Sequence, residues 1–364
     1  ESESMGICSS TSGEGPDEGL SAKDQKNLQR RRLSVAPKHV DTNKKQNNLP
    51  DVDYHEMEQK LDADERKSMG SMQCGARSNK GYVPYNPDKV NQDRFIVKFN
   101  LGGNQDAALF GVFDGHGEYG HHVSSFVKNA LPKYLGRHAK ISSDPKTAIL
   151  ESTNRMVQEL DSVNINTTFS GTTAIFCVKV GKKLYVANIG DSRCVLGRRL
   201  SDGKMETHGL SEDQKPDNPE ERKRILASGG RVEPLPGMPG EDTGPHRVWL
   251  KNVDVPGLAM SRSIGDKISQ RVGVISIPEI VEHDLTSGDE FMVLASDGVW
   301  EFMDNPEVVA FCQEKLDDVS SCAVDLCKRA HEKWKQEEDV IDDITCVIIK
   351  FNQSGRPAET TSTD

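Results

Sequence analysis

The chain has 364 residues, of which 57 are acidic and 46 are Lys or Arg, so its formal net charge is −11. This length allows one large domain or two ordinary ones with a sizeable core. The acidic balance argues against a nucleic-acid binder, which needs an excess of Lys and Arg, and fits an enzyme that recruits metal cations. No apolar run is long enough to span a membrane, and the first residues lack the apolar stretch of a secretory signal.

The first segment, residues 1–50, is poor in large apolar residues, so it predicts a disordered tail. Residues 51–71 form a lead-in, in which Tyr54 to Lys67 could make a short charged helix. One globular catalytic domain is then expected over 72–352, followed by a disordered tail over 353–364. We expect the chain to be a monomer.

Runs rich in β-branched and aromatic residues predict strands within this domain. They are Arg94 to Phe99, Ala107 to Phe113, Thr172 to Val180, Lys183 to Asn188, Cys194 to Arg198, Phe291 to Ala295 and Thr345 to Phe351. Helical periodicity is found in Tyr119 to Tyr134, Pro145 to Asp161, Asn218 to Ser228, Pro306 to Lys315 and Ser320 to Gln336. Strands in hairpin-like groups separated by helical pairs indicate an α+β layered domain.

One predicted helix carries clear end signals. Asn218 precedes Pro219 and stands three residues before Glu221, which is a capping pattern. Gly229 and Gly230 would end the same helix.

The eight cysteines lack the short paired spacings of a zinc site or a disulfide framework. We expect most of them to be reduced and buried, which favours an intracellular, cytoplasmic protein. They are Cys8, Cys74, Cys177, Cys194, Cys312, Cys322, Cys327 and Cys346.

The segment Val112 to Gly117 is the most informative part of the sequence, because an apolar run ends there in Asp-Gly-His-Gly. Asp114 can ligate a hard cation, His116 can transfer a proton near neutral pH, and the glycines allow a close backbone approach. For a single Asp-Gly, a turn-forming Asp that hydrogen-bonds its own backbone is the simpler interpretation. Four further acidic residues border predicted strands or turns and raise the weight of a metal site: Asp93, Asp191, Asp297 and Asp342.

In this order the motifs resemble the metal-dependent protein serine/threonine phosphatases of the protein phosphatase 2C family. The similarity extends over nearly all of residues 72–351. Its blocks are Asn91 to Arg94, Phe113 to Gly117, Ser170 to Ala174, Ala187 to Arg193, Asp213 to Pro216 with Glu220, Arg224-Ile225 and Gly229-Gly230, Leu258 to Asp266, Ala295 to Trp300 and Asp342 to Thr345. Each block is moderately specific, and their succession makes chance agreement very improbable.

The resemblance implies two stacked antiparallel β-sheets flanked by pairs of antiparallel helices, with a dinuclear site for Mg²⁺ or Mn²⁺ at one end. It implies that Asp93 and Asp114 are ligands, with Asp114 bridging both ions, and that Gly115 is a ligand through its carbonyl oxygen. Asp297 and Asp342 would complete one metal site. Asp191 matches a position associated with a third, weaker ion, to which Glu301 could contribute.

Two divalent ions lower the pKa of a bridging water, so that hydroxide can attack a phosphoserine or phosphothreonine of a protein substrate directly. No phosphoenzyme intermediate is then needed. His116 would protonate the departing alkoxide as general acid. The simpler alternative is a histidine that only hydrogen-bonds its own turn.

The sequence departs from the family pattern at a few places. Asp88 stands where many relatives have an Arg that contacts the substrate phosphate, so Lys89 or Arg77 could supply the cation, and we assign Lys89. Gln92 replaces a common Glu and would orient a ligand. Asp343 replaces the usual Asn and adds a charge. The segment 206–272 resembles a flap beside the catalytic cleft, with an expanded Gly/Pro-rich stretch; an ordinary surface loop is the alternative.

Near the N-terminus, Met5 to Ser10 matches a myristoylation pattern with Gly6 as acceptor. One acyl chain binds membranes only marginally, so palmitoylation of Cys8 would be the second signal for peripheral membrane anchoring. Ser34 follows three arginines and a leucine, as in a basophilic kinase site. An ordinary disordered tail is the alternative for this whole region.

An active protein phosphatase acting on phosphoproteins is therefore the leading hypothesis. A non-catalytic phosphoprotein-binding member is the second, although it would have no use for four carboxylates that repel one another without metal. A metallohydrolase acting on small phosphoesters is the third, and only the flap argues against it.

Overall fold

A computed structural model describes residues 72–235 and 244–351. The helix predicted for Tyr54 to Lys67, the two predicted tails, and the motifs at Gly6, Cys8 and Ser34 lie outside the described residues. Within the described part of the chain, no helix is long and apolar enough to cross a membrane.

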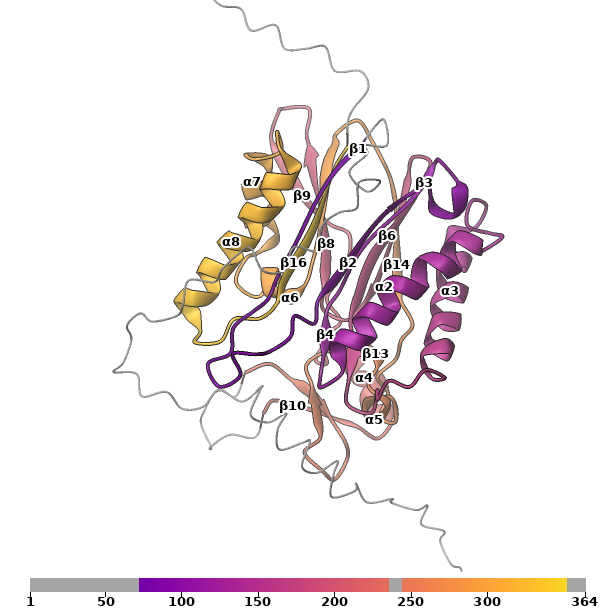
Figure 1. Cartoon of the computed structure of the whole chain (residues 1–364), viewed down its shortest axis with the longest axis vertical. Coiled ribbons are helices and arrows are strands. Elements are labelled where there is room, and N and C mark those ends of the chain that lie inside the picture. Colours follow the sequence, from indigo (N-terminus) through magenta and orange to yellow (C-terminus); the bar gives the residue numbers. More distant parts are fainter. Residues whose placement is uncertain (1–71, 236–243, 352–364) are drawn as a thin grey trace, which may run out of the picture. The chain divides into compact units, whose positions relative to one another are not determined.

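Two five-stranded antiparallel sheets form the centre of the domain (Figure 1). The first has the order β1 (Met72–Asn79), β16 (Ile344–Phe351), β15 (Asp289–Ala295), β8 (Arg193–Arg199) and β9 (Met205–Gly209). The second has the order β14 (Glu279–Asp284), β7 (Lys183–Ile189), β6 (Ala174–Val180), β3 (Ala107–Phe113) and β2 (Arg94–Phe99). The predicted α+β fold with two stacked antiparallel sheets is confirmed.

Helices cover the outer face of each sheet (Figure 1). The pair α2 (Gly120–Arg137) and α3 (Pro145–Leu160) packs on the second sheet, and α7 (Asn305–Gln313) and α8 (Val319–Glu337) pack on the first. Three of these four helices begin at an aspartate whose side chain accepts a hydrogen bond from a backbone N–H of the first turn: Asp144, Asp304 and Asp318.

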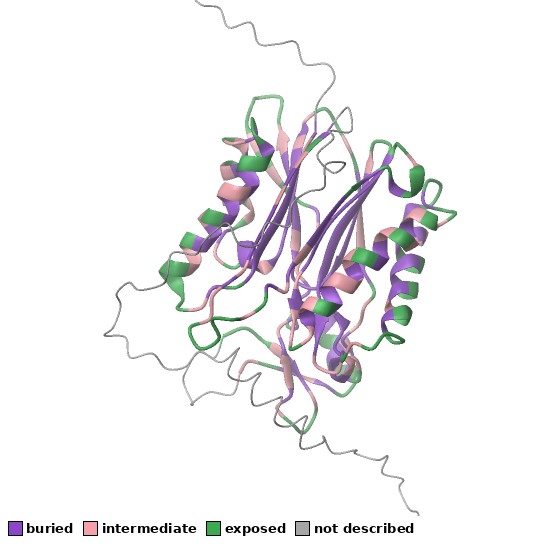
Figure 2. Cartoon of the chain, viewed as in Figure 1, coloured by how far each residue is buried: buried purple, intermediate pink, exposed green. Residues whose placement is uncertain are grey.

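The apolar side chains form three layers of core, one between the sheets and one under each helical pair. Figure 2 shows the buried residues gathered along the strands and on the inner sides of the helices. Every residue of β3 is buried, because its side chains alternate between the layer shared by the sheets and the layer under α2 and α3. This explains why Leu109 to Phe113 reads as an unbroken apolar run.

The predicted flap contains its own small sheet and core. The strands β10 (Arg231–Glu233), β11 (Arg247–Trp249) and β12 (Pro256–Leu258) pair with one another and pack with α4 (Pro219–Ala227). The remaining short elements are η1 (Leu101–Gly103), β4 (Gly115–His116), β5 (Gly171–Thr172), β13 (Ile264–Gly265), α5 (Lys267–Gln270) and α6 (Asp297–Trp300).

Three long strands were not predicted: β1, β9 and β14. Helix α8 passes so close to β1 that a Cβ at Gly75 would collide with the Val319 carbonyl. Several positions of β1 therefore carry small or polar residues, and the strand lacks the alternation of apolar and polar residues that predicts a strand. The capping-box interpretation of α4 is wrong in its detail. Asn218 does stand at the N-cap, but its Nδ2 donates to Asp213 O at 2.8 Å instead of its side chain capping the helix.

Of the eight cysteines, seven lie in the described residues, all of them as free thiols, and six of these are buried. This agrees with the expectation drawn from their spacing.

Candidate metal centre

The strand register brings the predicted metal ligands to one end of the sandwich. In the second sheet Arg94 pairs with Phe113, so Asp93 and Asp114 flank the last rung of the same ladder. In the first sheet Ala295 pairs with Cys346, and Asp297 and Asp342 lie just beyond that rung. The hydroxyl of Ser296 donates to Asp93 Oδ2 at 2.8 Å and thereby joins the ends of the two sheets.

The backbone around Asp114 is held in place by two threonines. The Asp114 carbonyl accepts hydrogen bonds from Thr173 N at 2.8 Å and from Thr172 Oγ1 at 2.9 Å, while its own N–H donates to Thr173 Oγ1. These threonines belong to the Ser170 to Ala174 block of the sequence. They fix the turn that carries the carboxylate.

Gly115 is required by close packing. A Cβ at this position would lie 2.5 Å from Gly120 O and 2.7 Å from Gln92 O, so a larger residue would displace the turn. Gln92 Nε2 donates to Gly117 O at 2.7 Å. This contact holds the Gln92 side chain against the turn, and the orienting role expected of it stays a prediction.

The carboxylates repel one another strongly. Removal from water, and then the charges of Asp93, Asp297, Asp342 and Asp191, hold the pKa of Asp114 well above its usual range. Burial and neighbouring carboxylates raise the pKa of Asp93 to about 7, and burial with the Asp191 charge raises that of Asp297 well above normal. A bound divalent cation would relieve this repulsion.

The donor set suits a hard cation. Asp191 Oδ1 and Asp297 Oδ1 are buried and have no hydrogen-bond partner within the described residues, and carboxylate oxygens are the ligands that Mg²⁺ and Mn²⁺ prefer. However, the carboxylate groups do not form a complete coordination site. Across 72–235 and 244–351 no three His, Cys, Asp or Glu side chains form a group that could hold a metal ion as they stand.

Two lysines compete for these carboxylates. Lys215 Nζ lies 2.5 Å from Asp191 Oδ2. Burial lowers the pKa of Lys215, but the charges of Asp191 and Asp297 outweigh it and hold the pKa above its usual value. Lys89 lies 2.5 Å from Asp343 Oδ1 and 3.9 Å from Asp342 Oδ1. Each lysine therefore pairs with a carboxylate beside the proposed ligands.

Asp343 is an anchor that sequence reasoning did not identify. Its side chain is 4 % exposed and accepts hydrogen bonds from Gly81 N at 2.7 Å, Gln92 N at 2.8 Å and Lys89 Nζ. It therefore ties the loop before β2 to the start of β16, beside both sets of predicted ligands. The signal available in the sequence was its departure from the usual Asn.

The structure separates the candidates for the phosphate-binding cation. Arg77 is buried in β1 and its Nε donates to Asn79 Oδ1 at 2.7 Å, whereas Lys89 Nζ lies 3.9 Å from Asp342 Oδ1, one of the predicted ligands. Arg247, on β11, is a further candidate that the sequence motifs did not indicate. Burial lowers its pKa while the charge of Asp191 opposes that effect, and its Nε has no partner within the described part of the chain.

His116 is paired with a residue whose role was missed. Its Nε2 lies 2.5 Å from Asp266 Oδ2, and Asp266 is fully buried and also accepts a hydrogen bond from Ser263 Oγ at 2.7 Å. Asp266 belongs to the Leu258 to Asp266 block, so its motif was visible although its function was not. Glu301 is exposed at the end of α6, and its predicted contribution to a third ion stays a prediction.

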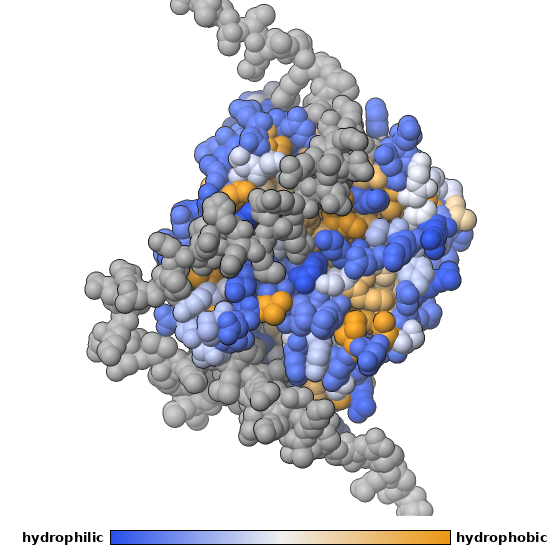
Figure 3. Space-filling view, viewed as in Figure 1, coloured by the Kyte–Doolittle hydropathy of each residue, from blue (hydrophilic) through white to orange (hydrophobic). Residues whose placement is uncertain are grey.

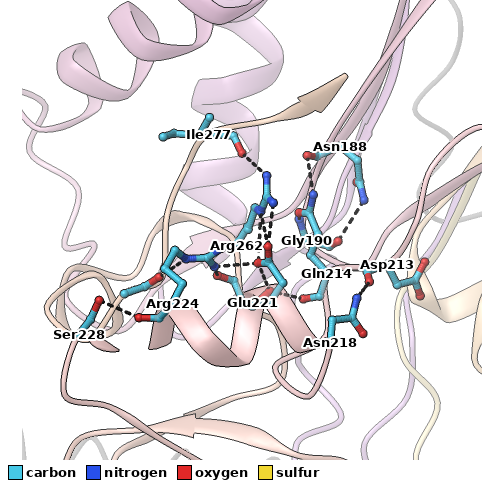
Figure 4. Close-up of polar contacts among 12 residues, drawn as sticks. Asn188, Gly190, Asp213, Gln214, Asn218, Glu221, Arg224, Ser228, Arg262 and Ile277 are labelled. Atoms are coloured by element: carbon cyan, nitrogen blue, oxygen red, sulfur yellow. Dashed lines mark hydrogen bonds and ion pairs between the residues drawn. The ribbon is translucent and has the colours of Figure 1, made fainter. Parts of the chain in front are cut away.

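A buried ion network attaches the flap helix to the segment that leads to Asp266 (Figure 4). Glu221, on α4, lies between Arg224 and Arg262, with contacts of 2.7 Å to each, and accepts a hydrogen bond from Ser261 Oγ at 2.5 Å. Arg262 Nη1 also donates to Ile277 O. The flap is thereby connected to the loop that positions the His116 partner.

Comparison with known proteins identifies the family. A family model described as Protein phosphatase 2C matches residues 86–338. The chain is 36 % identical to Probable protein phosphatase 2C 35 of Arabidopsis thaliana over 76 % of this chain and 83 % of that protein, and 39 % identical to Probable protein phosphatase 2C 64 of Oryza sativa subsp. japonica over 73 % and 63 %.

The fold is likewise similar to solved structures. A serine-threonine phosphatase 2C from Toxoplasma gondii superposes with a TM-score of 0.66 at 22 % identity, covering 79 % of this chain and 96 % of that one. A C. elegans sex determining protein superposes with a TM-score of 0.61 at 20 % identity, covering 78 % and 65 %. The chain therefore belongs to the protein phosphatase 2C family, a family of metal-dependent protein serine/threonine phosphatases.

Proposed function

We propose that this protein removes phosphate from phosphoserine and phosphothreonine side chains of proteins, using two Mg²⁺ or Mn²⁺ ions held by Asp93, Asp114, Asp297, Asp342 and the carbonyl of Gly115. The observation that carries the proposal is the cluster of mutually repelling carboxylates around the buried Asp114, in which Asp297 Oδ1 has no hydrogen-bond partner within the described residues. Asp191, with Glu301, would bind a third, weaker ion. When bound, the ions supply an activated water and neutralise charge on the phosphate.

The residues of the chain supply positioning and a proton. Asp266 engages Nε2 of His116, so Nδ1 is the ring nitrogen that remains to protonate the departing Ser or Thr oxygen. Water is the nucleophile in this proposal, and no side chain becomes phosphorylated. Gln92 and Asp343 keep the loop before β2 in place through the contacts described above.

Lys89 is the proposed cation for the substrate phosphate, and Arg247 is the alternative, because its Nε has no partner within the residues that the structure describes. Lys89 is supported by its position beside Asp342, although a phosphate would share its ammonium with Asp343. A Lys acts as a point charge, whereas an Arg could bind two phosphate oxygens at once.

The N-terminal proposal is independent of the catalytic domain. Acylation at Gly6 and Cys8 would anchor the protein at a membrane, and phosphorylation of Ser34 would weaken the adjacent basic patch. The test is whether a protein beginning at Gly6 leaves the membrane fraction when Gly6→Ala is introduced.

The central test is phosphate release from a phosphothreonine peptide with Mn²⁺ or Mg²⁺, with and without a chelator. Asp114→Asn removes one ligand charge with little change in volume, and Asp202→Asn, in an exposed turn, is the matched control. We expect metal-dependent turnover that Asp114→Asn abolishes and Asp202→Asn leaves intact. Turnover without metal would refute the mechanism.

A further inference from the structure

A cavity of about 700 Å³ lies between the C-terminal half of α2 and the facing part of α3. Figure 3 shows hydrophilic surface alternating with hydrophobic patches on the side of the molecule formed by this helical pair. The cavity is lined by Phe126 and Tyr134 and by basic side chains from both helices, chiefly Lys133, Arg137 and Arg155. Its volume is typical of a binding site.

The charges around this cavity do not balance. Its two acidic residues are already engaged, because Glu151 Oε2 lies 2.9 Å from His138 Nε2 and Glu159 accepts a hydrogen bond of 2.6 Å from the Tyr134 hydroxyl. In contrast, Lys133 and Arg137 have no carboxylate partner within the described residues. A chain with a net charge of −11 thus carries an uncompensated basic cavity.

The three cationic side chains are spaced to bind several negative charges along an extended segment. Lys133 and Arg137 are four residues apart on α2 and therefore project from the same face. Arg155 comes from α3, where its guanidinium lies 5.3 Å from the centre of the Tyr134 ring. Charges spread in this way match an extended acidic segment better than one compact anion.

A buried hydroxyl in the wall of the cavity also lacks a partner. Ser152, on α3, is 2 % exposed, and its Oγ makes no hydrogen bond within 72–235 and 244–351. Buried hydroxyls usually have a partner. A carboxylate entering the cavity would accept this hydrogen bond.

The cavity is separate from the metal centre although both adjoin α2. Gly120, at the start of α2, packs on Gly115 of the metal centre, whereas Arg137 ends the helix about 25 Å farther along its axis. None of the proposed metal ligands lines the cavity. A segment bound here could therefore belong to the same substrate that presents its phosphate at the metal centre.

We propose that this cavity docks an acidic peptide segment, rich in Asp and Glu, of the phosphoprotein substrate. The inference rests on the proposed function, and it adds a second recognition site remote from the phosphate. Carboxylates of the segment would pair with Lys133, Arg137 and Arg155, and one would reach Ser152 Oγ.

Fluorescence anisotropy with a labelled, unphosphorylated peptide of alternating Glu and Ala tests the docking directly. The measurement is made on the full chain in the presence of a chelator, so catalysis cannot contribute. We expect the double reversal Lys133→Glu, Arg137→Glu to weaken binding about tenfold or more, and Ser152→Ala to weaken it about threefold. The matched control is Lys182→Glu, Lys204→Glu, which changes net charge equally at exposed turns outside the cavity, and should weaken binding less than about twofold.

Kinetics separate this inference from the proposed function. Appending the acidic segment to a phosphothreonine peptide should lower KM for the wild type and not for the double reversal, while p-nitrophenyl phosphate is hydrolysed equally by both. Absence of turnover with intact peptide binding would count against the proposed function alone. Equal loss of binding in the control pair, or binding of inorganic phosphate at the cavity without binding of the Glu peptide, would overturn the docking proposal.

Discussion

Glu221 offers the sharpest test of how the flap is attached to the domain. This side chain is 7 % exposed and contacts Arg224, Arg262 and Ser261 at the same time. Replacing it by Gln keeps the size and removes the charge that both guanidinium groups share. The substitution should therefore destabilise the protein through electrostatics and not through packing.

The magnitude follows from the pKa of Glu221. Burial alone would raise this pKa, but the hydrogen bonds from Arg224, Arg262 and Ser261 outweigh burial and lower it from 4.5 to about 2. At 1.36 kcal/mol for each tenfold change in acidity, this corresponds to about 3 kcal/mol of stability at neutral pH. Because the folded-state pKa is depressed, the contribution is complete above pH 4.5 and is lost as the pH falls from there toward about 2.

Urea unfolding of wild type and Glu221→Gln at pH 7 and at successively lower pH measures this contribution. The difference in unfolding free energy should be about 3 kcal/mol at pH 7 and should shrink below about pH 4.5. Glu220→Gln is the control on the same helix, since the Glu220 side chain is 88 % exposed and its ion pair with Lys223 is long, at 3.9 Å. A difference that is independent of pH, or one that the control reproduces, would refute the argument.

Three further predictions concern the catalytic centre. Saturating Mn²⁺ or Mg²⁺ should raise Tm by about 5 °C by relieving carboxylate repulsion. Asp114→Asn should raise the Tm of the metal-free protein and reduce the increase in Tm that metal causes. Scanning calorimetry measures both Tm values, and an unchanged metal response in the variant would contradict the assignment of Asp114. His116→Gln should lower kcat about 100-fold or more on a phosphothreonine peptide and much less on p-nitrophenyl phosphate, whose leaving group needs no proton; an equal loss on both would exclude the general acid. Lys89→Ala and Arg247→Ala should be compared by KM for the phosphopeptide at saturating metal: a rise only in the Lys89 variant supports the proposed cation, and an unchanged KM there removes it.

Elements with a strong apolar pattern could be predicted from the sequence. The bounds of β2 and β3 agree with the predicted strands to the residue, because both strands are mostly apolar and polar residues stand directly before and after each of them. By contrast, β9 and β14 carry few buried residues, since they pair at sheet edges through backbone hydrogen bonds. An edge strand with one polar face gives little periodic signal.

The same distinction holds at the candidate site. Asp93, Asp114 and Asp297 stand at strand ends inside recognisable motifs, so their position at the same end of the sandwich could be anticipated from the family resemblance. The partner of His116 could not, because Asp266 is 150 residues away in sequence and meets the imidazole only through the pairing of β4, β5 and β13. Asp343 was likewise noted as a departure, but its role depends on a loop more than 250 residues earlier.

The hydrogen bond from Ser296 to Asp93 crosses from one sheet to the other, so the proposed metal centre lies at the seam of the sandwich. Since the proposed ligands come from both sheets, neither half of the domain would hold the full set. We expect a cavity in the layer between the sheets, such as the one that Leu294→Ala would leave, to shift the two sheets and with them the proposed ligands. During unfolding, metal affinity should therefore decline before helical content does. Loss of activity would then report a change in the packing of the two sheets.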